Sequence, residues 1–195
     1  MTEKLFYPII LFITELNVRG GDFMDEIFQE KTCCFFGHRK IDETDKLKTN
    51  LYEIIENLIV NEKVDTFLFG SKSDFDTLCL KITTELKQKY SHIRRVYVRA
   101  EYRYIDDEYK NYLLKNYDYT YYPESIKNSG RAAYVERNRE MIINSRFCVV
   151  YYDEKYFPPR RKNSRRDLGD YQPKSGTAIA YEYAVRKKKK VINVF

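Results

Sequence analysis

Several familiar signatures are missing from this chain of 195 residues. It has neither a glycine-rich GxGxxG turn nor a Walker A lysine motif, which excludes two common phosphate-binding turns. No internal repeat, low-complexity linker or heptad run is present either. A chain of this length that is 43% hydrophobic suffices for one sizeable core and is short for two. We therefore assign residues 25–195 to a single domain.

The four cysteines lack the spacing of a metal or redox site. Cys33 and Cys34 are adjacent, Cys79 falls in a helical pattern, Cys148 falls in a strand pattern, and no CxxC motif occurs. Such thiols are typical of small core residues in a reducing cytosol. We expect no metal site and a cytoplasmic protein.

Long hydrophobic runs are also missing. The apolar stretch from Leu5 to Leu16 is short and contains Glu15, whereas a membrane-spanning helix needs about 20 apolar residues. No small-residue cleavage site of a signal peptide follows it. We expect no membrane association, and we treat residues 1–24 as an N-terminal appendage of unassigned role.

Positive charge is concentrated in two places. The net charge is +6, but without ten clustered basic residues the chain would carry −4. The clusters are Arg160, Arg161, Lys162, Arg165 and Arg166, and Arg186, Lys187, Lys188, Lys189 and Lys190. Local basicity favours an anionic ligand or partner near the clusters, although a solvated surface explains it too. The first cluster lies in an irregular insert, residues 153–173, which has the length of a lid or binding loop.

From Lys31 onward the sequence alternates apolar strands with amphipathic helices. Strands are predicted at 32–36, 64–69, 94–99, 147–152 and 191–195. Helices are predicted at 47–59, 73–86, 109–114 and 134–144, and from Ser175 or Gly176; the rest of the tyrosine-rich segment 100–131 is expected to be loop. This order predicts an α/β fold, a doubly wound, mostly parallel sheet with helices on both faces and ligands at the carboxyl ends of the strands.

Unusual residues lie at or near the predicted strand ends. They are Gly37, His38, Arg39, Gly70, Ser71, Arg137, Asn138, Ser175, Gly176 and Thr177. In a doubly wound sheet the carboxyl ends of the strands converge, so these residues can form one pocket. The turn at Ser175 opens a helix, and the first N–H groups of a helix attract phosphate or carboxylate.

Each of these residues also has a purely structural explanation. Gly70 can simply be the glycine of a turn that ends a strand. His38 can be a turn residue that is hydrogen-bonded to the backbone. Arg137 can form an ion pair with Asp153 or Glu140. The many tyrosines of segment 100–131 can stack on a nucleobase or fill a shallow core.

Five short motifs, in this order, resemble the YpsA-like branch of the SLOG superfamily. They are Cys34-Phe35-Phe36-Gly37-His38-Arg39, Phe67-Leu68-Phe69-Gly70-Ser71, Glu136-Arg137-Asn138-Arg139-Glu140-Met141, Tyr151-Tyr152-Asp153 and Ser175-Gly176-Thr177. The resemblance extends across residues 31–195. That superfamily also contains the DNA-processing protein DprA and the LOG phosphoribohydrolases. The resemblance implies a Rossmann-like fold that binds a nucleotide or a nucleotide-derived ligand.

The hydrolase branch of that superfamily uses an arginine before strand four and the glutamate of a PGGxGTxxE motif. Arg137 stands where the arginine would be, but Ala180 occupies the glutamate position. Glu182 lies about 200° further round a helix and cannot simply replace it. Cleavage of an N-glycosidic bond needs a group that stabilises the cation or activates water. We therefore favour binding or sensing of a nucleotide, NAD or ADP-ribose-derived ligand over catalysis, and we assign no resident cofactor.

Roles for the candidate residues follow from that hypothesis. The N–H groups of Ser175, Gly176 and Thr177 would hold a phosphate, and Arg137 would neutralise it in a forked contact. Gly37 would permit close approach of the ligand. The adjoining His38 or Arg39 would contact its ribose or a second phosphate.

Two other function classes stay open. One is a phosphoribohydrolase or deoxyribosyltransferase that uses a different acid, with Glu182, Asp74 and Asp76 as candidates. The other is a nucleic-acid-binding module that uses the two basic clusters. The sequence does not distinguish a monomer from a homo-oligomer.

Overall fold

The computed structural model describes residues 28–158 and 174–195. In this part of the chain six strands form one sheet in the order β4-β3-β2-β1-β5-β6, and every neighbouring pair is parallel. The predicted doubly wound α/β fold is confirmed, and the sheet is parallel throughout. The proposed appendage and residues 159–173 of the insert lie outside the described residues.

The strands and helices alternate as the sequence predicts, with shifted bounds. The strands are β1 Thr32–Gly37, β2 Thr66–Phe69, β3 Arg94–Val98, β4 Tyr119–Tyr121, β5 Phe147–Tyr151 and β6 Lys190–Asn193. The helices are α3 Asp45–Val60, α4 Asp74–Lys89, α5 Asp107–Leu114, α6 Arg131–Ile143 and α7 Gly176–Arg186. Within residues 28–158 and 174–195, no helix is long and apolar enough to cross a bilayer.

Strand β4 corrects one prediction, because it lies in the tyrosine-rich segment that was expected to be loop. It has only three residues, all half-buried, at one edge of the sheet. Its pairing with β3, in which Tyr97 lies opposite Thr120, stabilises it. Such a short strand depends on its partner rather than on its own sequence pattern.

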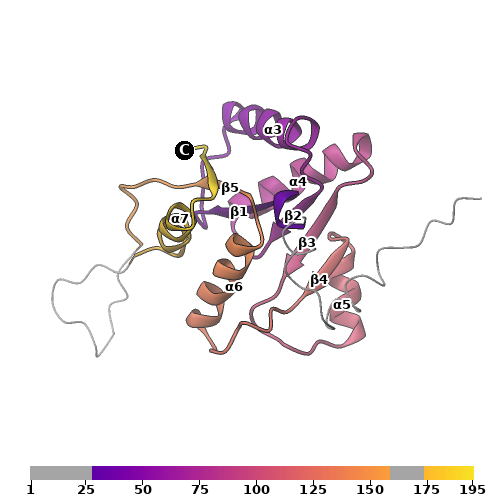
Figure 1. Cartoon of the computed structure of the whole chain (residues 1–195), viewed down its shortest axis with the longest axis vertical. Coiled ribbons are helices and arrows are strands. Elements are labelled where there is room, and N and C mark those ends of the chain that lie inside the picture. The colour runs from indigo at the N-terminus through magenta and orange to yellow at the C-terminus, as the bar shows by residue number, and fades with distance from the viewer. Residues whose placement is uncertain (1–27, 159–173) are drawn as a thin grey trace, which may run out of the picture.

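Helices cover both faces of the sheet (Figure 1), with α3 and α4 on one face and α6 and α7 on the other. Successive side chains of a strand point to opposite faces, so Phe35 belongs to the core under α3 and α4, and Phe36 to the core under α6 and α7. Phe35 lies 5.9 Å from Phe67 and 5.0 Å from Phe69, measured between ring centroids. Burial on both faces explains the continuous apolar runs of the central strands.

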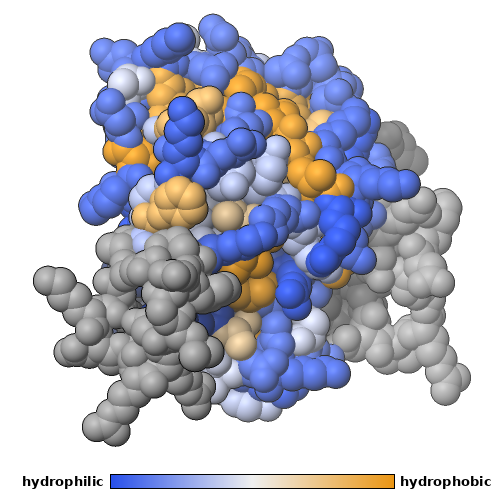
Figure 2. Space-filling model, turned by 90° about the vertical axis from the view of Figure 1, so that its left-hand side faces the viewer, coloured by the Kyte–Doolittle hydropathy of each residue, from blue (hydrophilic) through white to orange (hydrophobic). Residues whose placement is uncertain are grey.

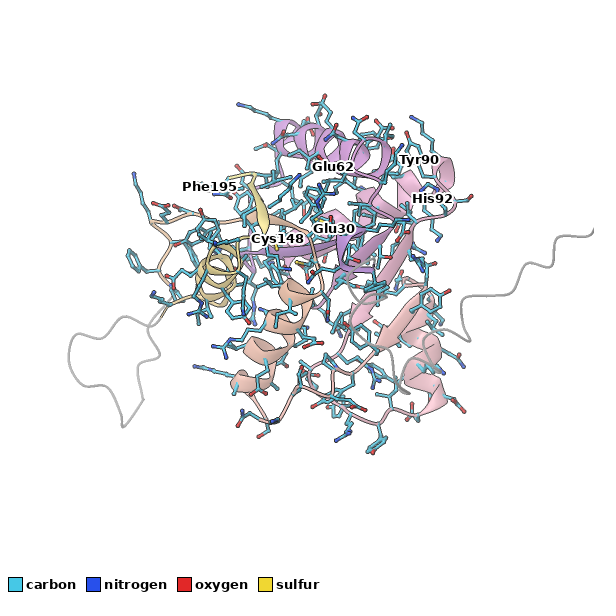
Figure 3. All side chains as sticks on the ribbon, in the orientation of Figure 1. Glu30, Glu62, Tyr90, His92, Cys148 and Phe195 are labelled. Atoms are coloured by element: carbon cyan, nitrogen blue, oxygen red, sulfur yellow. The ribbon has the colours of Figure 1, made fainter. Side chains whose placement is uncertain are left out.

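The cysteines belong to these cores. All four are free and buried, and the sulfur atoms of Cys34 and Cys148, on neighbouring strands, lie 3.4 Å apart. Figure 3 shows Cys148 at the centre of the molecule. Burial raises the pKa of the Cys33, Cys34 and Cys79 thiols. These three thiols are therefore neutral, and all four cysteines are core side chains, as expected.

The strand order reverses direction between β1 and β5. From β1 the chain builds outward through β2 and β3 to β4, and it then returns across the sheet through α6 to β5 and β6. At such a switch point the connections leave the two central strands in opposite directions. This opens a crevice at their carboxyl ends, where doubly wound proteins bind ligands.

Edge strand β6 and helix α7 form the side of the molecule that faces the viewer in Figure 2. Hydrophilic residues predominate there, with apolar patches between them. The strand begins at Lys190, which closes a basic run, and Val191 and Ile192 are only half-buried. Lysine at an edge strand disfavours pairing with a further strand.

Gly37, at the end of β1, packs against α4. A Cβ atom at this position would lie 2.3 Å from the Cβ of Phe75. Contact with Phe75 therefore gives this glycine a packing role, in addition to the approach of a ligand that the sequence suggested.

We expect Gly37→Ala to lower the free energy of unfolding by about 1–3 kcal/mol, because the added methyl group overpacks the core. Gly176→Ala is the matched control, because a Cβ atom there would meet no described residue within 4 Å; its effect should stay within about 0.5 kcal/mol. Urea unfolding followed by circular dichroism measures both changes. Equal stabilities of the two variants would contradict the packing role of Gly37.

Candidate ligand-binding cleft

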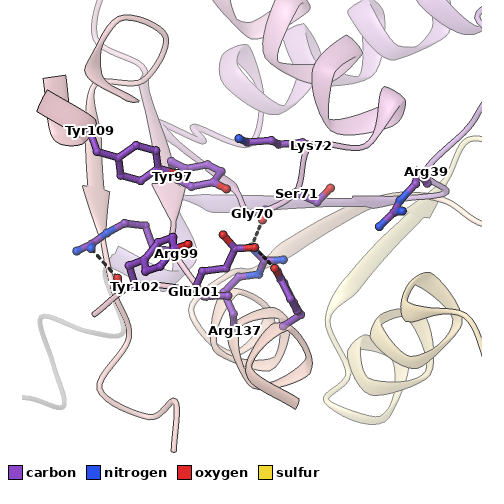
Figure 4. Close-up of a pocket in the computed structure, with 12 residues that line it drawn as sticks. Arg39, Gly70, Ser71, Lys72, Tyr97, Arg99, Glu101, Tyr102, Tyr109 and Arg137 are labelled. Carbon is purple, nitrogen blue, oxygen red and sulfur yellow. Dashed lines mark hydrogen bonds between the residues drawn. The ribbon is translucent and has the colours of Figure 1, made fainter. Parts of the chain in front are cut away.

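A cleft opens at the carboxyl ends of β1 and β2, beside the switch point. It has two lobes with volumes of about 540 and 360 Å³. Six residues line both lobes, namely Arg39, Gly70, Ser71, Lys72, Tyr134 and Arg137. We call the larger one the α7 lobe, because Gly176 and Thr177 at the start of α7 line it. We call the smaller one the tyrosine lobe (Figure 4), after Tyr97, Tyr102, Tyr109 and Tyr134.

Eight of the ten residues selected from the sequence line the α7 lobe. They are Gly37, Arg39, Gly70, Ser71, Arg137, Asn138, Gly176 and Thr177. They come from the ends of β1 and β2, from α6 and from the start of α7. The other two, His38 and Ser175, line neither lobe.

His38 and Ser175 have structural partners instead. The Oγ atom of Ser175 accepts a hydrogen bond from the Ala178 N–H at 3.0 Å and so caps α7. The buried His38 ring accepts a hydrogen bond at Nε2 from the Asp153 N–H at 3.0 Å and lies 4.2 Å from the Tyr156 ring. Burial lowers the pKa of His38, which favours the neutral ring that an accepting nitrogen requires. His38 is therefore hydrogen-bonded to the backbone, which is the structural explanation considered from the sequence.

Arg137 is only 3% exposed and lies beneath the turn between β2 and α4. Its Nη1 donates to the carbonyl oxygen of Gly70 and, at 3.2 Å, to that of Val98. Its Nε donates to Oδ1 of Asn138 at 2.8 Å. The guanidinium thus joins α6 to the ends of β2 and β3. Nε and Nη1 already bond the protein, so a forked contact with phosphate, which uses two nitrogens, would require at least one of them to exchange its partner.

Gly70 makes room for this guanidinium. A Cβ atom on Gly70 would lie 2.5–2.7 Å from the Arg137 side chain. Neither alternative ion pair of Arg137, with Asp153 or with Glu140, is formed in the structure. Burial lowers the pKa of Arg137, but an arginine remains charged at neutral pH.

Asp76, in the first turn of α4, is 3% exposed and lines the α7 lobe. Its Oδ2 accepts a hydrogen bond from the Ser71 N–H at 2.7 Å, whereas its buried Oδ1 has no hydrogen-bond partner in the described part of the chain. Burial raises the pKa of Asp76 to about 6, although the Ser71 hydrogen bonds and the charge of Arg137 oppose the shift. From the sequence, Asp76 was a candidate only as an alternative catalytic acid. Ser73, three residues earlier, caps α4 by accepting a hydrogen bond from the Asp76 N–H, and a serine at this spacing before an acidic residue was the available signal.

The other two candidate acids lie outside the cleft. Glu182 pairs with Lys174 at 2.5 Å, and Asp74 pairs with Lys40 at 3.3 Å. Neither carboxylate lines a lobe. Among residues 28–158 and 174–195, no group of three histidine, cysteine, aspartate or glutamate side chains could hold a metal ion.

The start of α7 presents N–H donors at one edge of the cleft. The N–H groups of Gly176 and Thr177 bond to no other described residue, while the next two N–H groups of the helix bond to Ser175. Unpaired N–H groups and the helix dipole attract negative charge. Arg39 and Lys72, which are exposed, add two cations to the same cleft.

No protein-family model and no curated protein matches the sequence. A structure of DNA processing protein A from Helicobacter pylori, reported for its single-stranded DNA binding mode, matches with a TM-score of 0.51. The two proteins share a fold. The match has 12% sequence identity and covers 88% of this chain and 67% of that chain. It supports the Rossmann-like fold that the resemblance to the SLOG superfamily implies.

The raised pKa of Asp76 predicts a specific pH dependence of stability. Between its ordinary pKa of 3.8 and its folded pKa of about 6, the native state binds more protons than the unfolded state. The free energy of unfolding should therefore fall as pH rises through this window, by about 3 kcal/mol from this group. Asp76→Asn should remove that part of the slope. Urea unfolding of both proteins from pH 4 to pH 7 measures it, and parallel profiles would contradict the buried titration.

Proposed function

We propose that this chain is a cytoplasmic, YpsA-like member of the SLOG superfamily that binds a nucleotide or an NAD- or ADP-ribose-derived ligand in the cleft. The observation that carries the proposal is the position of the α7 N-terminus, where Gly176 and Thr177 line a cleft at the switch point of a parallel sheet and their N–H groups have no partner among the described residues. A phosphate group would occupy this edge of the cleft.

The charges around the cleft support a phosphate-bearing ligand. Gly176 and Thr177 would donate their N–H groups to the phosphate, and the exposed Arg39 and Lys72, which line the same lobe, would add positive charge. Arg137 contributes positive charge from beneath the cleft without being exposed. A Cβ atom on Gly176 would meet nothing within 4 Å among the described residues, so these residues do not block the approach to the start of α7.

The surroundings of α7 favour binding over cleavage. Ala180, at the glutamate position of the hydrolases, is 2% exposed and belongs to the core under α6 and α7. A carboxylate at that place would have to be buried in an apolar environment. In the α7 lobe Asp76 is the lining carboxylate, and it lies beneath the cleft with one oxygen bonded to Ser71. Its negative charge would partly offset the positive charge of the neighbouring Arg137 in the site.

Isothermal titration calorimetry with nucleoside monophosphates, NAD and ADP-ribose tests the proposal. We expect saturable binding by the wild type, weakened about 3- to 20-fold by Arg39→Ala or Lys72→Ala, since each removes one charge-assisted contact. Lys40→Ala is the matched control, because Lys40 is adjacent, exposed and paired with Asp74 outside the cleft. No heat with any of the ligands, or an equal loss in the control variant, would contradict the proposal.

A second candidate function is binding of single-stranded nucleic acid. The favouring observations are the fold shared with a protein reported to bind single-stranded DNA and the basic residues at the end of α7. Arg186 and Lys187 are exposed and lie 5.0 and 5.7 Å from the centroid of the Tyr183 ring. Aromatic rings beside cations are typical of sites that stack bases along a charged groove. The other basic cluster lies outside the described residues.

Salt dependence distinguishes this second function. Binding of a single-stranded oligonucleotide should weaken with salt, with a logarithmic slope near −0.7 per phosphate neutralised. The double variant Arg186→Ala/Lys187→Ala should make that slope shallower by about 1.4, whereas Lys40→Ala should leave it unchanged. Fluorescence anisotropy between 50 and 300 mM salt, roughly the range over which such effects appear, measures it. A flat profile for the wild type would contradict nucleic-acid binding.

A further inference from the structure

Phosphate binding does not account for the tyrosine lobe. Its lining includes Tyr102, which is 59% exposed, and Tyr134, which is 38% exposed. Aromatic rings that gather around a cleft while remaining accessible mark a binding surface, since a packing role would bury them. The lobe adjoins the α7 lobe, with which it shares Gly70, Ser71 and Arg137.

The rings come from separate parts of the chain. Tyr97 lies on β3, Tyr102 follows that strand, Tyr109 lies on α5 and Tyr134 lies on α6. Tyr102 and Tyr109 meet edge to face, with centroids 6.5 Å apart. Figure 4 shows Tyr97 and Tyr109 on one side of the cavity and Glu101 facing it. A planar group that enters here would meet aromatic surface from three elements.

Polar groups in the lobe give it a chemical preference. Burial raises the pKa of Tyr97 to about 12, and its hydroxyl has no hydrogen-bond partner within the described ranges. One oxygen of Glu101 accepts a hydrogen bond from the Tyr134 hydroxyl, which leaves the other oxygen to accept from a ligand. Arg99 donates to the carbonyl oxygens of Tyr102 at 2.8 Å and Arg103 at 3.2 Å, which fixes the loop that carries these groups.

We propose that the tyrosine lobe holds the base of the nucleotide and that Glu101 selects bases with an exocyclic amine. The inference rests on the proposed function, in which the phosphate occupies the α7 lobe. The volume of about 360 Å³ suffices for a planar heterocycle. A carboxylate accepts a hydrogen bond from an amine and repels a carbonyl oxygen at the same position. Adenine and cytosine carry such an amine, whereas hypoxanthine and uracil carry a carbonyl oxygen at the same ring position and are expected to bind less tightly.

Calorimetry with ribose 5-phosphate and two matched nucleotide pairs tests this inference. We expect AMP to bind at least tenfold more tightly than ribose 5-phosphate, because stacking of a base on aromatic side chains is worth about fivefold to a hundredfold. We also expect AMP to bind at least tenfold more tightly than IMP, and CMP more tightly than UMP, since a site built for an N–H donor rejects its carbonyl analogue.

Three variants separate the contributions. Tyr102→Ala should remove most of the advantage of AMP and leave the affinity for ribose 5-phosphate within twofold. Tyr104→Ala is the matched control, since Tyr104 is 86% exposed in the same loop and does not line the lobe. Glu101→Gln should reduce the ratio of AMP to IMP affinity to below threefold.

The outcomes distinguish this inference from the proposed function. Equal affinities for ribose 5-phosphate and AMP, unchanged in Tyr102→Ala, would overturn the base-binding lobe while the phosphate site stands. An AMP to IMP ratio near one in the wild type, or one unaffected by Glu101→Gln, would overturn selection by Glu101. Absence of binding by ribose 5-phosphate and by every nucleotide would overturn both.

Discussion

A buried guanidinium holds the cleft together. Arg137 reaches from α6 to the carbonyl oxygens of Gly70 and Val98, at the ends of two neighbouring strands. Gly70 directly follows β2, and Val98 is the last residue of β3. A buried carbonyl without a partner is destabilising. Burial of the charge itself is unfavourable, and three hydrogen bonds together with the nearby charge of Asp76 offset it. Arg137 also lines both lobes of the cleft.

The consequences reach both lobes. Because the guanidinium occupies the place of a Cβ atom on residue 70, the turn after β2 needs a glycine. Because the two strand ends are tied to α6, Tyr134 on that helix is held beside the loop that carries Glu101. The open N-terminus of α7 faces the same cleft from the other side of the switch point. The arrangement provides fixed donors for an anion on one side and aromatic surface on the other, which suits a ligand with a phosphate and a base.

The sequence could predict much of the fold, because the strands are buried on both faces and the helices carry regular apolar stripes. The convergence of the strand ends followed from the doubly wound order. Strand β4 could not be predicted, since its three residues are stabilised by pairing with β3 and have no distinctive pattern. The roles of Gly37 and Gly70 depend on contacts with Phe75 and Arg137, which no local spacing reveals.

The site was less predictable than the fold, because most of its side chains are brought together only by contacts between distant parts of the chain. Local chemistry identified the start of α7, since a serine before a helix is a capping residue wherever the helix lies. Asp76 faces the cleft because its carboxylate bonds the Ser71 amide across the turn, and helical periodicity alone does not indicate that. The tyrosine lobe combines side chains from β3, α5 and α6, so it exists only in the folded chain.

A crystal structure of the protein with a nucleoside 5′-monophosphate bound would show directly where the phosphate lies. We expect phosphate oxygens within about 3 Å of the amide nitrogens of Gly176 and Thr177, the usual length of such hydrogen bonds. A phosphate bound elsewhere, for example at Arg186 and Lys187, with the start of α7 left unoccupied, would contradict this expectation.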